Sequence, residues 1–436
     1  MSNWQVEDLR YWDDKICDLA EEHGLDWYPI TYETCDYFEM IGNMAYHGMP
    51  THYGHWSYGK SFEVQHQRYQ LGMTGLPYEL IINSNPCISY LMKENPLYLQ
   101  ILIMAHCVGH SDFFKNNRTF AYTRADTVVP RMRNAKKRIQ SYIEDPSIGI
   151  EKVERLIDAA HALSYQVPRL PHEIRDIRAE RKAWQKNNKK LLDSGVIDER
   201  RFNQLPIEAE YDILGFINAY ARGLKDWEKD IIEIVRDEAH YFMPQIRTKI
   251  MNEGWACFWH FKILNELELE QKYHIPFLKS HNQVVRPHIA NINPYHIGFH
   301  LFNKIYERYG IEECFIAREV HNDESFLRQY LTREDCEELN LFSYSDSDDM
   351  IEIDEVSDED GWKHVKQTLL QQIGANSIPV IYIDFVEDDT LILYHEHDGS
   401  RDLEINHAEK VVRHTKTLWK NDVKLITMVD DAPFEI

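Results

Sequence analysis

The chain has 436 residues, enough for roughly two to three domains, and its 43% hydrophobic and 12% aromatic content is that of a folded globular protein. Its formal net charge of −24 at pH 7 argues against a nucleic-acid-binding protein and against contact with anionic membranes, because both functions usually need a basic surface. The sequence has no run of about 18 apolar residues, so we expect no membrane-spanning helix.

The N-terminal residues and the cysteines indicate a reducing compartment. Residues 1–8 are acidic and lack the apolar stretch of a secretory signal peptide. The seven cysteines are scattered and form no Cys-x-x-Cys pair, which is typical of free thiols rather than of a disulfide framework. We therefore expect a cytoplasmic protein.

The first hundred residues mix helical and irregular patterns. Residues 1–30 have apolar positions at helical spacing, and residues 32–40 are predicted to form a short helix. Residues 48–60 are rich in Gly, His and aromatic side chains without a clear period, which is typical either of a functional loop or of a loop packed by its own rings. Residues 78–86 predict a strand or short helix that ends at an Asn-Pro pair.

The middle of the chain is predicted to be mainly helical. Residues 97–105 form an apolar run too long for a typical strand, which predicts a buried helix. Helical patterns follow over 128–200 and 206–270, with Pro244 ending or kinking one helix. The basic stretch 175–190 predicts an ordinary exposed helix, whose charge would also suit an acidic partner.

An acidic segment precedes the C-terminal part. Nine acidic residues and no basic one occur between Asp346 and Asp360, which is the composition of a linker. Beyond it the patterns predict two helices, a β-hairpin and a last strand. We therefore predict an α+β protein with a large, mainly helical domain at 1–344, an acidic linker at 345–360 and a small α+β domain at 361–436.

Two histidines follow the apolar run. His106 and His110 are four residues apart, so on a helix they share one face. This spacing allows two imidazoles to bind one transition metal. The alternative is a pair of core histidines that are hydrogen-bonded to neighbouring carboxylates.

A second predicted helix offers a third ligand. Glu253, Cys257 and His260 are spaced to share one helical face, and Glu253 would complete the histidine pair to the three protein ligands of a catalytic zinc site. This interpretation requires helix 98–115 to pack against helix 245–265. The expected cofactor is zinc or another divalent transition metal. We expect no nucleotide cofactor, because the sequence has neither a Walker A nor a dinucleotide-binding motif.

The tetrad Glu-Gly-Trp-Ala at 253–256 is similar to one found in some zinc peptidases with an HExxH motif, in which its Glu is the third ligand. Those peptidases carry a Glu directly after the first His as general base, and Cys107 occupies that position here. Another base would be needed, with Glu238, Glu79 and His260 as candidates. We predict Glu238 and His260 as the catalytic groups. A cysteine nucleophile is the alternative, although buried thiols are more often structural.

Several segments together resemble the stage V sporulation protein R (SpoVR) family. They are Gly48-Met-Pro, His55 to Lys60, Tyr78 to Asn83, Ala105-His106, Gly109 to Asn117, Met251 to Ala256, Trp259-His260 and Asn293-Pro-Tyr. The resemblance covers most of the chain. It implies an association with spore cortex formation or, in bacteria that form no spores, with a stress response. It also implies a serine protein kinase and a von Willebrand factor A-like protein as partners, but no established reaction.

Two functions remain open at this point. The first is a metal-dependent hydrolase, or a relic of one, in which a metal-bound water is the nucleophile. The second is a non-enzymatic regulatory or scaffold protein that acts with the serine protein kinase, in which the histidines are structural. The acidic linker, the separate C-terminal domain and the basic stretch 175–190 motivate the second function.

Overall fold

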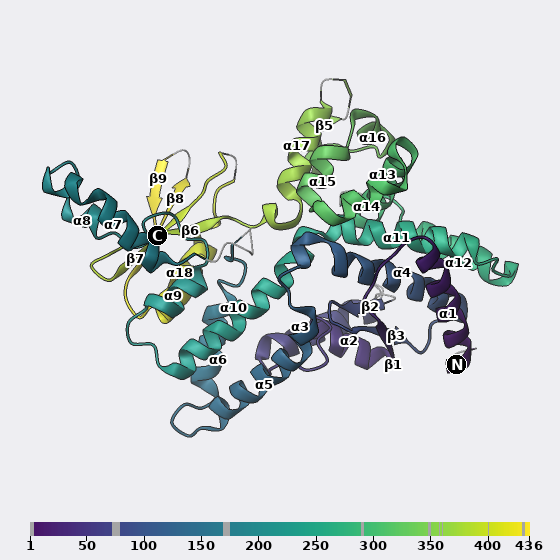
Figure 1. The fold of residues 1–436 in the computed structure, drawn as a ribbon, viewed down its shortest axis with the longest axis horizontal. Coiled ribbons are helices and arrows are strands. Elements are labelled where there is room, and N and C mark those ends of the chain that lie inside the picture. The colour runs from purple at the N-terminus through teal and green to yellow at the C-terminus, as the bar shows by residue number, and fades with distance from the viewer. Residues whose placement is uncertain are drawn as a thin grey trace. The chain divides into compact units, whose positions relative to one another are not determined.

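The computed structural model describes residues 4–71, 79–168, 175–288, 292–347, 350–356, 358–359, 361–399, 401–429 and 432–436. The chain forms two compact units, and each combines two separate stretches of sequence. The first unit contains residues 1–134 and 244–377, and the second contains 135–243 and 378–436. The predicted α+β class is confirmed, because helices dominate and three small sheets accompany them (Figure 1).

Most helices belong to the first unit. They are α1 (Val6–Glu22), α2 (Tyr37–Ala45), α3 (Trp56–Gln70), α4 (Leu97–Asn116), α11 (Lys249–Glu266), α12 (Gln271–Val284), α13 (Pro294–Tyr309), α14 (Ile311–Val320), α15 (Asp323–Tyr330), α16 (Arg333–Glu338) and α17 (Trp362–Gln372). Two further helices, α5 (Val128–Glu144) and α10 (Asp226–Arg247), contain the points at which the chain passes between the units. Pro244 lies inside α10, whose helical hydrogen bonding continues for three more residues.

The first unit also contains a three-stranded sheet with the order β1–β3–β2. Its strands are β1 (Ile30–Cys35), β3 (Cys87–Met92) and β2 (Glu79–Ile82), with β1 parallel and β2 antiparallel to β3. The helix predicted over 32–40 is therefore wrong in its first half. Residues 30–35 include β-branched and aromatic side chains that pair with β3, and the helix α2 begins only after Asp36, whose side chain caps it. Of the strand or short helix predicted over 78–86, residues 79–82 form the strand β2, and Tyr78 lies outside the described residues.

Helix α4 is the centre of the first unit. Its residues from Leu99 to Phe114 are all buried, because α1, α11, α12, α14 and the sheet surround it. A helix that is apolar on every side is stable only inside such a core. The predicted buried helix is therefore confirmed, and its few polar side chains must find partners inside the protein.

Helices α4, α11 and α13 pack unusually closely (Figure 1). A Cβ atom added to Gly109 of α4 would lie 2.7 Å from the backbone of Ala256 on α11. On the opposite side of α11, a Cβ added to Gly254 would lie 2.4 Å from the backbone of Gly298 on α13. These glycines let the backbones touch, and they confirm the predicted packing of helix 98–115 against helix 245–265.

The acidic segment contains regular structure. Strands β4 (Phe342–Ser347) and β5 (Met350–Val356) pair as an antiparallel ribbon. The prediction of a linker did not include these strands. Apolar and acidic residues alternate over 351–354, a period of two that suits a strand in spite of the charge. The domain boundaries predicted at 344 and 361 stay a prediction, while the compact units divide at 377.

The second unit ends in a four-stranded sheet with the order β6–β7–β8–β9. Its strands are β6 (Ile381–Glu387), β7 (Thr390–His395), β8 (Val423–Val429) and β9 (Ala432–Glu435). Its helices are α6 (Ile150–His161), α7 (Ile177–Asp193), α8 (Glu199–Phe202), α9 (Ile213–Tyr220) and α18 (Ile405–Trp419). The predicted hairpin is present as β6 and β7, and α18 connects the parallel pair β7 and β8. Among the described residues, no helix combines the length and apolar character needed to cross a membrane.

Candidate metal centre

The crossing of α4 and α11 brings together the three residues predicted as metal ligands. His106, His110 and Glu253 are 2%, 4% and 5% exposed. The Oε2 atom of Glu253 lies 3.5 Å from Nε2 of His106 and 3.4 Å from Nε2 of His110. A fourth side chain, Glu79 at the start of β2, places its Oε1 atom 3.6 Å from Nε2 of His106. Glu79, His106 and His110 thus offer ligand atoms within 4.8 Å of one another, and Oε2 of Glu253 lies beside both histidines.

The spacing of these atoms fits a cation better than direct hydrogen bonds. In the described part of the chain, Nε2 of His106 and Oε2 of Glu253 are buried and have no hydrogen-bond partner. Bonds of about 2.1 Å to a tetrahedral ion place neighbouring ligand atoms about 3.4 Å apart. The separations of 3.4 and 3.5 Å match that value, so the residues present fit a divalent metal with nitrogen and oxygen ligands.

The other ring nitrogens of both histidines are held by protein groups. Nδ1 of His110 lies 2.8 Å from Oδ1 of Asn252, and Nδ1 of His106 lies 2.9 Å from Nδ1 of His260. An imidazole that donates from Nδ1 presents an unprotonated Nε2 in its neutral form, which is the form that binds a metal. Both rings are therefore oriented with a lone pair available beside Glu253.

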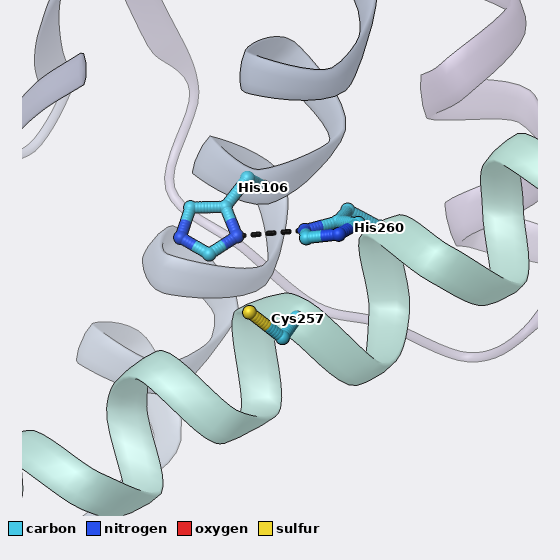
Figure 2. A group of neighbouring side chains, drawn as sticks. All are labelled: His106, Cys257 and His260. Atoms are coloured by element: carbon cyan, nitrogen blue, oxygen red, sulfur yellow. Dashed lines mark hydrogen bonds between the residues drawn. The ribbon is translucent and has the colours of Figure 1, made fainter. Parts of the chain in front are cut away.

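Figure 2 shows His106 and His260 facing each other across the helix crossing, joined by their hydrogen bond. The hydrogen bonding continues beyond them, because Nε2 of His260 lies 2.8 Å from Nδ1 of His281 on α12. Burial, together with the neighbouring histidines, holds the pKa of His260 well below its usual value and lowers that of His281 to about 4. His260 and His281 are therefore neutral near pH 7, so His260 can accept a hydrogen bond at Nδ1 and donate one from Nε2 to His281.

Glu253 carries its negative charge inside the protein. Burial raises the pKa of Glu253, but Lys249 and the two histidines outweigh this effect and hold the pKa well below its usual value. Lys249 bonds to the other carboxylate oxygen, Oε1, which leaves Oε2 directed at the histidines. Burial lowers the pKa of His110, but Glu253 raises it by more, so the two groups attract each other. Burial and the Glu253 charge also raise the pKa of Tyr295, whose ring stacks near His106.

The two cysteines beside the predicted ligands differ in their surroundings. Cys257 lies on the same face of α11 as His260 and close to His106 (Figure 2), and the three residues offer ligand atoms that lie within 4.8 Å of one another. Cys107 lies on another face of α4, and its sulfur is 3.2 Å from the Ser89 hydroxyl on β3. Burial raises the pKa of both thiols well above its usual value, which argues against a cysteine nucleophile.

The predicted catalytic groups are placed differently. Nδ1 of His260 lies against Nδ1 of His106, so His260 contacts a predicted ligand, and its catalytic role stays a prediction. Glu238 is buried on α10 in the second unit, and its catalytic role stays a prediction. Glu79 is the candidate base that reaches the centre. Sequence reasoning missed His281, because no spacing rule connects α12 to His260. It also passed over Lys249, although that residue precedes Glu253 by one helical turn.

The end of α4 has a structural role. Asp112 is fully buried and accepts hydrogen bonds from the Trp255 indole at 2.8 Å and from the Asp26 backbone at 2.9 Å. The side chain of Asn117 donates to two carbonyl groups at the end of α14. This part of the Gly-His-Ser-Asp-Phe-Phe-Lys-Asn-Asn motif therefore fixes α4 against its neighbours and does not face the centre.

The aromatic stretch 48–60 is packed by its own rings. Tyr53 and Tyr58 are buried, and the ring of His52 lies 4.3 and 4.7 Å from theirs, measured between centroids. Residues 56–60 form the start of α3, so only residues 48–55 remain outside a helix. Of the two interpretations left open, the structure supports the second, packing by the segment's own aromatic rings.

The chain was compared with known proteins. The sequence model of SpoVR-like proteins matches residues 3–378, and that of the SpoVR-like C-terminal domain matches residues 376–430. The change between these two matches coincides with the point at which the chain enters the second unit after residue 377. A relative from Escherichia coli (strain K12), described as the uncharacterized protein YcgB, is 33% identical over 487 residues, an alignment that covers all of this chain and 94% of the relative. No solved structure matches the chain.

Proposed function

This chain belongs to the family of SpoVR-like proteins, and we propose that its α4–α11 centre binds a divalent transition metal such as zinc through His106, His110 and Glu253. A single observation carries this proposal. Nε2 of His106 and Oε2 of Glu253 are buried polar atoms without hydrogen-bond partners, and they lie 3.5 Å apart. Buried polar groups that make no hydrogen bond keep part of their desolvation cost, about 1–3 kcal/mol each, and a bound cation would offset it.

The chemistry we propose is metal-dependent hydrolysis. A divalent metal held by three protein ligands lowers the pKa of a bound water toward neutrality. Among the residues of this chain, Glu79 is suited to be the base that accepts a proton, because its carboxylate lies beside the ligands and its side chain is partly open to solvent. Lys249 holds Glu253, while Asn252 and His260 orient the two histidines.

The test is the metal content of protein purified without a metal-affinity tag. We expect about one equivalent of a transition metal in the wild type, and a loss of about a hundredfold or more in affinity in the His106→Ala, His110→Ala double variant. The matched control is His364→Ala, which removes an exposed histidine of α17 in the same unit. Substoichiometric metal in the wild type, or unchanged metal in the folded double variant, would overturn the proposal.

We propose, from the SpoVR family name and the resemblance described above, that the protein acts in sporulation, in formation of the spore cortex, or in a stress response. A hydrolytic centre buried between helices suits a small or extended substrate better than a polymer network. We therefore propose that an effect on the cortex is indirect or acts on a precursor.

A second candidate function is a regulatory one, with the serine protein kinase and the von Willebrand factor A-like protein as partners. The observation that favours it is the surface of α7. Four of its lysines are exposed and form no ion pair within the described residues: Lys182, Lys186, Lys189 and Lys190. An acidic partner surface would complement them. Co-purification of these proteins with the wild type, and its loss when the four lysines are replaced by Gln, would support this function. Equal recovery of the partner proteins with the wild type and with the four-lysine variant would count against this function.

A further inference from the structure

A second group of ligand atoms shares His106 with the proposed metal centre. His106, Cys257 and His260 each offer one ligand atom, and these three atoms lie within 4.8 Å of one another. The three side chains are only 2%, 0% and 1% exposed. Figure 2 shows the sulfur of Cys257 pointing toward the two imidazoles, from the same helix as His260. We call this group the sulfur site. The proposed centre uses neither Cys257 nor His260 as a ligand.

The two sites use different nitrogen atoms of the His106 ring. Its Nε2 atom faces Oε2 of Glu253 at 3.5 Å, which is the contact of the proposed centre. Its Nδ1 atom faces Nδ1 of His260 at 2.9 Å. The two nitrogens of an imidazole point in different directions, so a metal at Nδ1 lies at a different place from a metal at Nε2. One ring can therefore serve both sites at once.

His260 already presents a lone pair to the sulfur site. Its Nε2 atom lies 2.8 Å from Nδ1 of His281 and can donate to it, which leaves Nδ1 of His260 unprotonated in the neutral ring. Bonds of about 2.1 Å to a tetrahedral metal place two nitrogen ligands about 3.4 Å apart. The two Nδ1 atoms therefore need to separate by roughly half an ångström, which a small rotation of each ring supplies.

The thiol of Cys257 has no other partner. It forms no disulfide, and it makes no hydrogen bond with any residue that the structure describes. The buried thiols of Cys87 and Cys107 differ, because each lies beside a serine hydroxyl, at 3.3 and 3.2 Å. Burial raises the pKa of the Cys257 thiol well above its usual value, but a metal ion deprotonates the thiol that coordinates it. One thiolate and two imidazoles are ligands that suit zinc and cobalt.

We propose that His106, Cys257 and His260 bind a second divalent transition metal such as zinc, with the His106 ring as a bridge between the two ions. Nε2 of His106 then binds the ion of the proposed centre, and Nδ1 binds the second ion. Binding of the second ion releases two protons, one from the Cys257 thiol and one from Nδ1 of His106. The thiol becomes a thiolate, the ring becomes an imidazolate, and no oxidant or reductant is needed.

The order of binding follows from these protons. The ion beside Glu253 meets an Nε2 atom of His106 that is already unprotonated, whereas the second ion must displace two protons from buried groups. The sulfur site therefore fills at a higher metal concentration, and protein purified without added metal retains the first ion alone. The sulfur site goes beyond the proposed function and does not depend on it, because His106 can also bind either ion singly.

Titration of the metal-free, full-length protein with cobalt(II) tests the sulfur site. A thiolate bound to cobalt gives a charge-transfer band in the near ultraviolet that nitrogen and oxygen ligands do not give. We expect the wild type to bind about two equivalents of cobalt, with the band developing as the second one binds. Cys257→Ser and Cys257→Ala should bind about one equivalent and lack the band. Two variants are used because a hydroxyl is less suited than a methyl group to a buried position, and circular dichroism checks that both fold.

Cys314→Ser is the matched control. Cys314 is a fully buried cysteine of the same unit, and its thiol lies 3.6 and 3.7 Å from the backbone carbonyls of Phe302 and Gly310. A serine hydroxyl can donate to the same carbonyls. This variant should therefore keep both equivalents of cobalt and the thiolate band.

Glu253→Gln separates the sulfur site from the proposed centre. It weakens the first ion and leaves the three ligands of the sulfur site unchanged, so the thiolate band should remain. If the wild type binds a single ion with this band and Glu253→Gln does not alter it, the sulfur site stands and the proposed function falls. A folded wild type without the band at saturating cobalt, or a band that persists in both Cys257 variants, would overturn the sulfur site. A band lost in Glu253→Gln as well would also overturn it, because Cys257 would then belong to one common centre.

Discussion

Two buried carboxylates in the first unit resemble each other and differ in one respect. Asp335, at the start of α16, and Glu253, on α11, are 0% and 5% exposed. Each lies near a histidine and a basic side chain, and the pKa of each is held below its usual value despite burial. Both oxygens of Asp335 are hydrogen-bonded, whereas one oxygen of Glu253 has no partner among the described residues.

The partners of Asp335 show what a purely structural carboxylate looks like. Arg308 binds both of its oxygens, at 2.9 and 3.0 Å, and His300 adds a contact at 3.2 Å. The backbone and hydroxyl of Thr332 complete the set at 3.0 and 2.8 Å. The chain has thus enclosed this charge completely. At Glu253 the chain leaves the set of hydrogen bonds incomplete, and the metal that we propose would complete it.

The largest effect that this comparison predicts is on stability. Asp335→Ala leaves Arg308, His300 and the start of α16 without their acceptor, so we expect unfolding free energy to fall by about 3–5 kcal/mol. Chemical denaturation of the metal-free protein measures this change in unfolding free energy. Glu338→Ala, which removes a half-exposed acid of the same helix paired with Lys304, should cost less than about 1 kcal/mol. Equal losses of unfolding free energy in the two variants would show that the buried hydrogen bonds of Asp335 stabilise the protein no more than an exposed ion pair does. Metal content should not change in either.

The same carboxylate predicts a dependence on pH. Hydrogen bonds from His300, Arg308 and Thr332 outweigh burial and lower the pKa of Asp335 in the folded state below the value of about 3.9 that the unfolded chain has. Its contribution is therefore complete above about pH 5 and is lost as pH falls below about 4. We expect the stability difference between the wild type and Asp335→Ala to shrink in that acidic window, measured by denaturation at several pH values. A difference that stays constant from neutral pH to pH 3 would contradict this assignment.

Glu253→Gln should separate function from stability. The substitution removes the charge but keeps an amide of nearly the same size, and the basic partner Lys249 has a side chain that is 59% exposed and can turn to water. Because the folded state stabilises the Glu253 charge, we expect metal-free stability to fall by about 1–2 kcal/mol, which is less than in Asp335→Ala. Metal affinity should fall by about a hundredfold, because an anionic ligand is lost. A stability loss as large as that of Asp335→Ala would show that Glu253 is a structural carboxylate.

The sequence predicted the helices of this centre and their contact, because periodicity reports directly which residues share a face. His106 and His110 lie one turn apart on α4, and Glu253 faces them from α11. The close contact at Gly109 and Ala256 follows from residue size. These are local properties, which a sequence displays without knowledge of its fold.

What the sequence could not show were partners set by tertiary packing. The chain of hydrogen bonds to His281 depends on how α12 lies against α11, and the approach of Glu79 depends on the register of β2 in its sheet. Strand β1 was assigned to a helix because its pairing with β3 joins residues more than fifty positions apart.

The smallest effect concerns the support of a ligand rather than the ligand itself. His281 is surrounded by the rings of Phe261, Phe277 and Phe299, so His281→Phe should preserve the packing while it removes the acceptor for His260. His260 would then be free to adopt the other tautomer, and Nδ1 of His106 would lose its fixed partner. We expect metal affinity to fall about tenfold, with a shifted absorption spectrum of the cobalt-substituted protein. His281→Asn keeps a hydrogen-bond acceptor for His260, so it should restore most of the metal affinity and most of the wild-type cobalt spectrum. If the Phe and Asn variants bind metal equally tightly, the hydrogen bonds along the three histidines do not support metal binding. His260 and His281 would then contribute only to packing.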